Sequence, residues 1–404
     1  MSTSGAQAST GPHAGPLLRF LDPWEQLRTS DSAIGTLLGR RGDQGSFRLE
    51  TYRDVDALRR ATCLKQSTIA EFPTMEHLES FEQYLSCIRQ LIRKEVDDSK
   101  FKFSWSSPLS GRPAQLSKLS GLAQEHAMAA TSMAAALRAA GCLLAEAATT
   151  GSAASDLPAA VRAAAESSAS GSAGPLADAA TFLRRAAGVF TWLADDALIR
   201  LMGKLPTDRP TELVPAASAC MARICLAEAQ ALTAHRAGQR GTGAGITSAV
   251  HLGAATLFED AIKGLKEKSA ELGTLSERLR RYLAISGGLQ RARAQRNWSL
   301  ELLAKGEAGQ GEGVCMDAAA GVQQCMVVAE GEETWKRVLA AELDDIEACR
   351  KRIEKERIGV YYQSVVRKTN NSLPPGGPKV LVSAIPYVPG ACQSSPEVGQ
   401  ALGP

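Results

Sequence analysis

The sequence predicts an all-α fold of stacked helical hairpins, with one or two short strands. Three consecutive segments between Pro175 and Lys268 carry apolar residues at three- and four-residue steps, which places those side chains on one helical face. Most of these positions are alanines, whose small side chains let neighbouring helices approach closely. No alternation of strands and helices is visible, and this disfavours a nucleotide-binding α/β enzyme.

The three segments are expected to form the core of the domain. The first helix should begin at Pro175, which suits a first-turn position, and should end before Gly203. The second should begin near Pro215. The third carries its apolar face on Ile246, Val250, Ala254, Leu257, Ala261 and Leu265. Faces of this kind need partners on more than one side, as in a helical-hairpin array.

The flanking sequence predicts further helices around this core. Before it, helices are expected over residues 48–71, from about residue 74, and over 116–148, with a short alternating strand at 101–105 and a flexible loop at 149–174. After it, we expect helices over 275–305, 314–328 and 334–357, with a glycine-rich break at 306–313. Residues 380–388 should cross the body as a strand or a polyproline segment.

Composition restricts the class of protein. The chain has 404 residues, 44% of them hydrophobic, and a formal net charge of +3, which is too small to indicate nucleic-acid binding. Nine cysteines without paired spacing favour reduced thiols in the cytoplasm, and neither they nor the five histidines predict a metal site. Charged residues interrupt the apolar stretch 121–148, so we expect a buried helix and no transmembrane segment.

Several motifs occur in a characteristic order along the chain. Leu78, Phe81, Tyr84 and Ile88 lead into Phe101-Lys-Phe-Ser-Trp105, and Leu226-Ala-Glu-Ala-Gln230 follows the alanine-rich helix. Near the end, Gly359-Val-Tyr361 precedes Ile385-Pro-Tyr-Val-Pro389. Together these resemble the Bro-one (BRO) domain family, the domain found at the N-terminus of Alix. The resemblance covers nearly the whole chain.

This resemblance implies a fold and a function. The fold would be a curved, boomerang-like all-α domain over residues 16–390, with a tetratricopeptide-like core, a small sheet, and disordered segments at 1–15 and 391–404. The function would be that of a non-enzymatic adaptor without a cofactor, which binds the C-terminal amphipathic helix of an ESCRT-III subunit in endosomal sorting or membrane remodelling. Such a protein would be cytoplasmic and peripherally recruited to endosomes.

The resemblance also assigns candidate binding residues. An ungapped match from the Leu226 motif places the ESCRT-III patch at Thr233, Ile246 and Val250, which are expected on an exposed helix face. Thr233 stands where well-known members of the family carry an aromatic ring, and aromatic anchors are frequent hot spots. Tyr361 matches a tyrosine in a second surface patch. By position alone, Ile246 and Val250 could equally be core residues. If Thr233 has destroyed the patch, the chain would be a helical scaffold module with a partner other than ESCRT-III.

A run of cations extends from Lys263 to Arg296. Its members are Lys263, Lys266, Lys268, Arg278, Arg280, Arg281, Arg291, Arg293 and Arg296. Three glutamates dilute the run, so a solvated helix face is the first interpretation. A peripheral contact with anionic lipid, as in an endosomal membrane, or with an acidic partner helix is the functional alternative.

Overall fold

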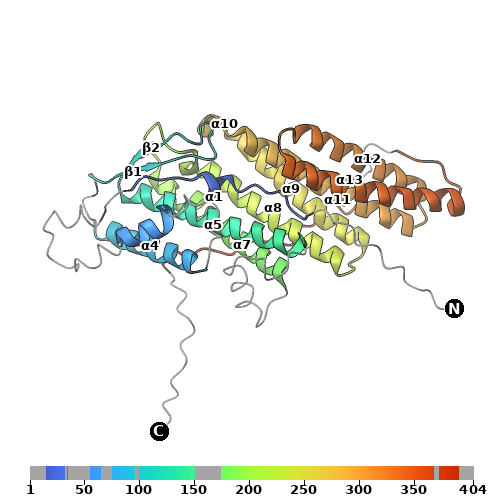
Figure 1. Cartoon of the computed structure of the whole chain (residues 1–404), viewed down its shortest axis with the longest axis horizontal. Helices are drawn as coiled ribbons and strands as arrows, with labels where there is room; N and C mark the ends of the chain where they lie inside the picture. Colours follow the sequence, from blue (N-terminus) through green and yellow to red (C-terminus); the bar gives the residue numbers. More distant parts are fainter. Residues whose placement is uncertain are drawn as a thin grey trace, which may run out of the picture.

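The computed structural model describes residues 15–31, 34, 55–64, 75–95, 98, 100–150, 174–367 and 373–390. Long helices stack side by side into an elongated, curved array, with one small hairpin near one end (Figure 1). The predicted disordered termini, 1–15 and 391–404, lie outside the described residues except for Gly15. Most of the predicted loop 149–174 and much of the predicted helix 48–71 also lie outside them.

The first part of the chain builds the end of the array that carries the sheet. Its elements are α1 (Asp22–Gln26), a π-helical turn (Arg60–Leu64), α4 (Met75–Arg93), β1 (Lys102–Trp105), β2 (Ser117–Ser120) and α5 (Leu122–Thr150). Strand β1 confirms the predicted alternation, but the start predicted for the next helix is wrong. Residues 117–120 pair antiparallel with β1 and bury every second side chain, a period of two that four residues could not reveal from sequence.

The three predicted core helices are confirmed. They are α7 (Pro175–Trp192), α8 (Pro215–Gln239) and α9 (Ala244–Glu267). Helix α7 continues through a π-helical turn (Leu193–Ala197) and a 3-10 turn (Ile199–Leu201), and a second 3-10 turn (Thr211–Leu213) precedes α8. The short α10 (Ser269–Leu272) leads to α11 (Glu277–Ala304), which packs along α9.

The predicted glycine-rich break at 306–313 is wrong, because α12 (Ala308–Val328) already begins inside it. The glycines serve packing: a Cβ at Gly309 or Gly313 would collide with the carbonyl oxygen of Ser364 or Val366. These glycines therefore let an extended segment lie directly against the helix. Helix α13 (Glu333–Glu356) follows and ends in a π-helical turn (Arg357–Tyr361).

A buried ion pair joins the helices at the centre of the array. Arg138 of α5 donates from Nε and Nη2 to both oxygens of Glu228 of α8, at 2.9 and 2.5 Å. Tyr282 of α11 donates its hydroxyl hydrogen to the same carboxylate, and Arg138 also donates to the carbonyl oxygen of Phe20. Three helices and the N-terminal segment thus meet at one charge pair.

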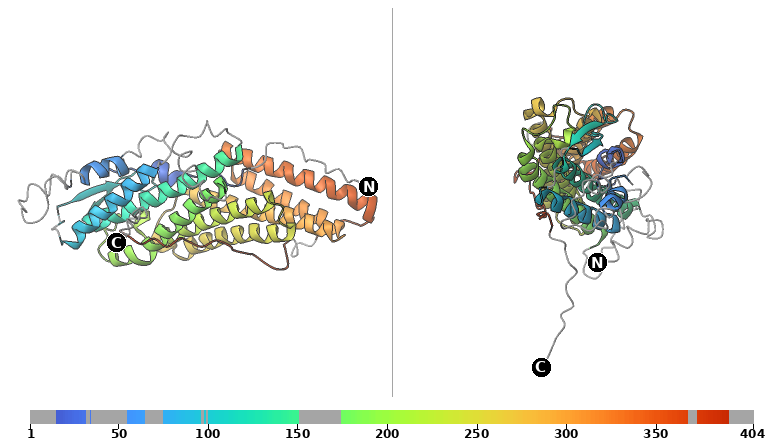
Figure 2. Two further views of the ribbon diagram at one scale, coloured as in Figure 1. Left: turned by 90° about the horizontal axis from the view of Figure 1, so that it is seen from below. Right: turned by 90° about the vertical axis from the view of Figure 1, so that its left-hand side faces the viewer.

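Two extended segments brace opposite sides of the array, as the left view of Figure 2 shows. On one side of α9, His251 bonds Gln290, which in turn donates to Pro16 of the N-terminal segment. On the other side, Ala249 accepts from Lys379. Residues two apart on a helix point about 200° apart, so the two segments lie on opposite faces of α9. Residues 373–390 are called the C-terminal strap below.

Helix α5 is long and apolar enough to cross a membrane by length and composition, over Leu122–Thr149. In the fold, 94% of its most apolar window is buried. Its charged Glu125 and Arg138 are both paired inside the protein. The expectation of a buried core helix is therefore confirmed.

The close contact between the strap and α7 lets us predict how a substitution at Gly188 changes stability. A Cβ at Gly188 of α7 would collide with the carbonyl oxygen of Ile385, whereas a Cβ at Gly321 of α12 would meet nothing within 4 Å. We expect Gly188→Val to dislodge the strap and to lower the free energy of unfolding by about 1–3 kcal/mol more than Gly321→Val. Denaturant unfolding measures this, with proteolysis of the strap as a second readout. Equal losses in both variants would contradict strap docking at Gly188.

Candidate functional site

The three residues of the predicted patch lie on one face of α8 and α9, but they differ in exposure. Ile246, in the first turn of α9, is 54% exposed, and Thr233 is half-buried with its hydroxyl bonded back to the carbonyl oxygen of Ala229. Val250 is only 1% exposed. The expectation that Val250 lies on an exposed face is therefore wrong.

Val250 is buried where the C-terminal strap crosses α9. Lys379 N donates to Ala249 O at 2.9 Å, one residue away. The amide of Gln230 donates to Val250 O at 3.0 Å and to Lys379 O at 2.8 Å. Its Oε1 accepts from the backbone of Leu381 at 2.9 Å. Gln230, the last residue of the Leu226 motif, thus fastens the strap across both helices.

The strap also adds apolar surface at this crossing. Val380 and Leu381 are 46% and 54% exposed, and they follow directly after the backbone bond at Ala249. Ile246 lies one helical turn before Ala249, and Thr233 lies one turn after Gln230. We name Thr233, Ile246, Val380 and Leu381 the crossing patch. Sequence reasoning anticipated a crossing segment at 380–388 but not its contribution to a binding surface.

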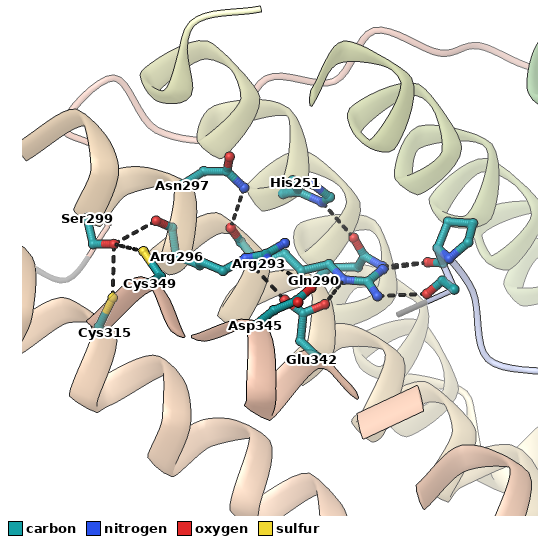
Figure 3. Close-up of polar contacts among 12 residues, drawn as sticks. His251, Gln290, Arg293, Arg296, Asn297, Ser299, Cys315, Glu342, Asp345 and Cys349 are labelled. Atoms are coloured by element: carbon teal, nitrogen blue, oxygen red, sulfur yellow. Dashed lines mark hydrogen bonds and ion pairs between the residues drawn. The ribbon is translucent and has the colours of Figure 1, made fainter. Parts of the chain in front are cut away.

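A polar network lies on the opposite side of α9 (Figure 3). His251 Nδ1 donates to Gln290 Oε1 at 2.8 Å, and Arg293 donates to Glu342 at 2.6 Å. Burial and the charge of Arg293 lower the pKa of His251 to about 3. Burial alone would raise the pKa of Glu342, but Arg293 and Arg296 outweigh it and lower that pKa. His251 is therefore neutral, and the buried charges are matched.

A cavity of about 460 Å³ opens beside this network and is lined by residues of α5, α8, α9, α11 and α13. Its charged lining residues are already engaged: Arg293 and Arg296 contact Glu342, and Arg296 also contacts Asp345 at 3.1 Å. A catalytic site needs a nucleophile or base free to act on a substrate. The arrangement is that of a structural network that holds the N-terminal segment.

In the described part of the chain, the cysteine and histidine side chains indicate no further candidate site. No group of three or more His, Cys, Asp or Glu residues there could hold a metal ion, and each cysteine described is a free thiol. Ser299 Oγ contacts the thiols of Cys315 and Cys349 at 3.1 and 3.7 Å. The hydrogen bond with Cys315 lowers the pKa of Cys349 to about 7.

The predicted run of cations is largely paired. Lys263 lies near Glu267, Lys268 near Glu271 and Arg280 near Glu277. The further partners are Glu332 and Asp22 for Arg278, Glu259 for Arg291, Glu342 for Arg293, Asp345 for Arg296, and two backbone carbonyls for Arg281. The surface pairings favour the solvated helix face over a basic surface for lipid, whereas Arg293 is buried in the polar network and does not belong to that face.

The second predicted patch lies at the end of α13. Tyr361 closes the π-helical turn there, and its ring lies 3.4 Å from the position that a Cβ at Gly306 would occupy, in the turn between α11 and α12. It is 36% exposed, and Ile358, Val360 and Tyr362 beside it are exposed as well. The structure thus places Tyr361 among exposed apolar residues at the end of α13, a helix that contributes no residue to the crossing patch.

These features define a helical-hairpin scaffold with an apolar surface where an extended segment crosses it. The family model for the BRO1-like domain matches residues 42–402, and the chain belongs to this family. No curated protein matches the chain.

Solved structures share the fold. The ALIX BRO1 domain in complex with CHMP4C is 18% identical, with a TM-score of 0.65, and the match covers 91% of this chain and 96% of that one. ALIX in complex with the SIVmac239 PYKEVTEDL late domain is 18% identical (TM-score 0.67; 91% and 49% covered). A Bro1 domain structure described as the basis for endosomal targeting is 13% identical (TM-score 0.61; 89% and 91% covered).

The buried histidines predict how stability depends on pH. Burial lowers the pKa of His251 to about 3 and that of His126 to about 4, so both side chains stay neutral in the fold. In the unfolded chain the same histidines have their ordinary pKa of 6.5 and take up protons as the pH falls below it. Stability should therefore fall as the pH drops from 6.5 towards 4, by up to ~1.4 kcal/mol per pH unit for each histidine.

The substitution His251→Asn distinguishes the contribution of His251 to this pH dependence from that of His126. His251→Asn keeps a donor for Gln290 and removes one titrating group, so the slope of unfolding free energy against pH should fall by about half. Denaturant titrations at several pH values between 4 and 7.5 measure the slope. An unchanged slope would show that His251 is not held neutral by the fold.

Proposed function

We propose that this chain is a non-enzymatic adaptor that binds the C-terminal amphipathic helix of an ESCRT-III subunit through its crossing patch. The observations that support it most are the exposed Ile246 on α9 and the exposed Val380 and Leu381 on the strap, which is bonded to α9 one helical turn after Ile246. The ALIX BRO1 domain, which shares the fold, is found in complex with CHMP4C. The process served would be endosomal sorting or membrane remodelling, with peripheral recruitment to endosomes.

The patch can accept one face of a short helix. Amphipathic helices dock through apolar residues at three- and four-residue steps into an apolar surface. Ile246 would be the anchor from α9, and the strap would supply the rest of the apolar area. Val250 lies beneath the surface, so its contribution would be to support the α9 backbone at the strap crossing rather than to contact the partner.

Thr233 limits the strength of this contact. A threonine buries less apolar surface than an aromatic ring, and each Å² of apolar surface contributes about 25 cal/mol. We therefore expect a weak complex, with Kd on the order of 10–100 μM, or roughly −5 to −7 kcal/mol.

Titration calorimetry with an ESCRT-III C-terminal peptide tests the proposal. Ile246→Asp places a charge in the apolar contact and should weaken binding by at least about tenfold, whereas Thr233→Phe should tighten it. Val327→Asp, at an exposed valine at the end of α12, is the matched control and should bind like the wild type. If Ile246→Asp binds as well as the control, the partner site lies elsewhere.

Val250→Asp has a different expected outcome. Because Val250 is buried, an aspartate there would carry an unpaired charge into the core, which should unfold the protein or lower its unfolding free energy by several kcal/mol. Thermal unfolding of this variant beside Ile246→Asp measures the difference. A stable Val250→Asp protein would show that the surroundings of Val250 tolerate a charge and are not a closed core.

The second candidate function is a helical scaffold with a partner other than ESCRT-III. Thr233 favours it, because the expected aromatic anchor is missing. A panel of C-terminal peptides from different ESCRT-III subunits decides between the two. Binding of none of them at millimolar concentration would favour the scaffold.

A further inference from the structure

The strongest unused surface of the protein is the exposed apolar end of α13. Over eight residues the chain exposes five large apolar or aromatic side chains: Ile358, Val360, Tyr361, Tyr362 and Val365. Val360 and Tyr362 are 64% and 83% exposed. Exposed apolar clusters of this density mark interaction sites. We name these five residues the α13 tip.

The α13 tip projects from one extremity of the molecule. Figure 1 and the left view of Figure 2 both place the end of α13 at one end of the long axis, away from the sheet. Tyr362 has φ 53°, a left-handed conformation that bulky residues rarely adopt. The reversal at Tyr362 sends the chain back along α12, where Val366 N donates to Gly309 O. The apolar side chains are therefore left on a convex turn.

Two exposed lysines share the surface with these apolar side chains. The glutamates of the last α13 turns are engaged: Glu354 lies near Arg350, and Glu356 lies near Arg352. Arg357 and Arg367 are paired with residues of α12. Lys351 and Lys355 are exposed and make no ion pair with any described residue. Their four-residue spacing puts them on one helix face that leads towards Ile358.

The geometry points to a bilayer surface as the occupant of the tip. We propose that the α13 tip docks on an anionic membrane, with Val360, Tyr362 and Ile358 entering the headgroup layer and Lys351 and Lys355 facing anionic headgroups. A convex cluster inserts into a bilayer without a matching groove, and tyrosine rings partition to the membrane interface. Lys351 and Lys355 beside the insertion point supply the attraction to anionic lipid.

This contact is separate from the proposed peptide site. The crossing patch is formed by α8, α9 and the strap, while the tip lies at the end of α13 beside the turn between α11 and α12. One protein could therefore hold a membrane with the tip and a helical peptide with the crossing patch. The two activities should respond to different substitutions.

Vesicle co-sedimentation of the full chain tests the proposal. We expect binding to phosphatidylcholine vesicles that contain phosphatidylserine and at least about tenfold less binding to phosphatidylcholine alone. Val360→Asp combined with Tyr362→Asp should reduce binding at least about tenfold. Lys351→Gln combined with Lys355→Gln should reduce it by a similar factor, because two attractive charges are lost.

Two controls sharpen the result. Val327→Asp adds the same charge at another exposed valine of the same hairpin and should bind vesicles like the wild type. The Val360→Asp, Tyr362→Asp variant should still bind the ESCRT-III peptide, which shows that it is folded. The proposal is overturned if the wild type stays in the supernatant with anionic vesicles, or if the tip variant binds them as well as Val327→Asp does.

Discussion

The buried ion pair between Arg138 and Glu228 is the interaction on which the arrangement of the core depends. Both side chains are withdrawn from water, and leaving either one without its partner in such a site typically costs about 3–5 kcal/mol. The pair fixes α5 against α8, and Tyr282 brings in α11. Because Arg138 also holds the carbonyl oxygen of Phe20, the N-terminal segment is positioned by the same charge.

Helix α8 transmits this constraint to the functional face. Gln230 follows Glu228 by two residues and therefore points to the other side of the helix, where its amide fastens the strap to Val250 and Lys379. A single motif, Leu226 to Gln230, thus anchors the core inside and the strap outside. The crossing patch depends on both anchors, since its apolar side chains come from α9 and from the strap that Gln230 holds.

Much of this architecture could be predicted from the sequence, because long helices repeat their apolar positions often enough to be recognised. The starts of α7 and α8 and both ends of α11 and α13 were predicted close to the observed ones, and α9 was predicted from its apolar face. The failures involve information that is not local. In the sequence, Gly309 and Gly313 look like a helix break, yet both lie within α12. Glycine is required at these helix positions because a backbone segment distant in sequence packs directly against them.

The candidate site shows the same limit. The four-residue spacing correctly placed Ile246 and Val250 on one face of α9. It could not show that the strap crosses α9 at Ala249, within the same stretch of helix. Ile246, one turn before the crossing, is 54% exposed, whereas Val250, whose carbonyl oxygen accepts from Gln230 at the crossing, is 1% exposed. Val380 and Leu381 were not recognised as patch residues, since their neighbours are more than 130 residues away in sequence.

Hydrogen–deuterium exchange of the full chain with and without a bound ESCRT-III C-terminal peptide tests the central claim most directly. Exchange reports the local opening of backbone hydrogen bonds, so it locates the surface that a ligand stabilises. If the crossing patch is the binding site, the peptide should slow exchange in the first turns of α9 and at residues 379–382 of the strap together. Slowed exchange confined to other helices, or faster exchange of the strap, would contradict a surface built from both.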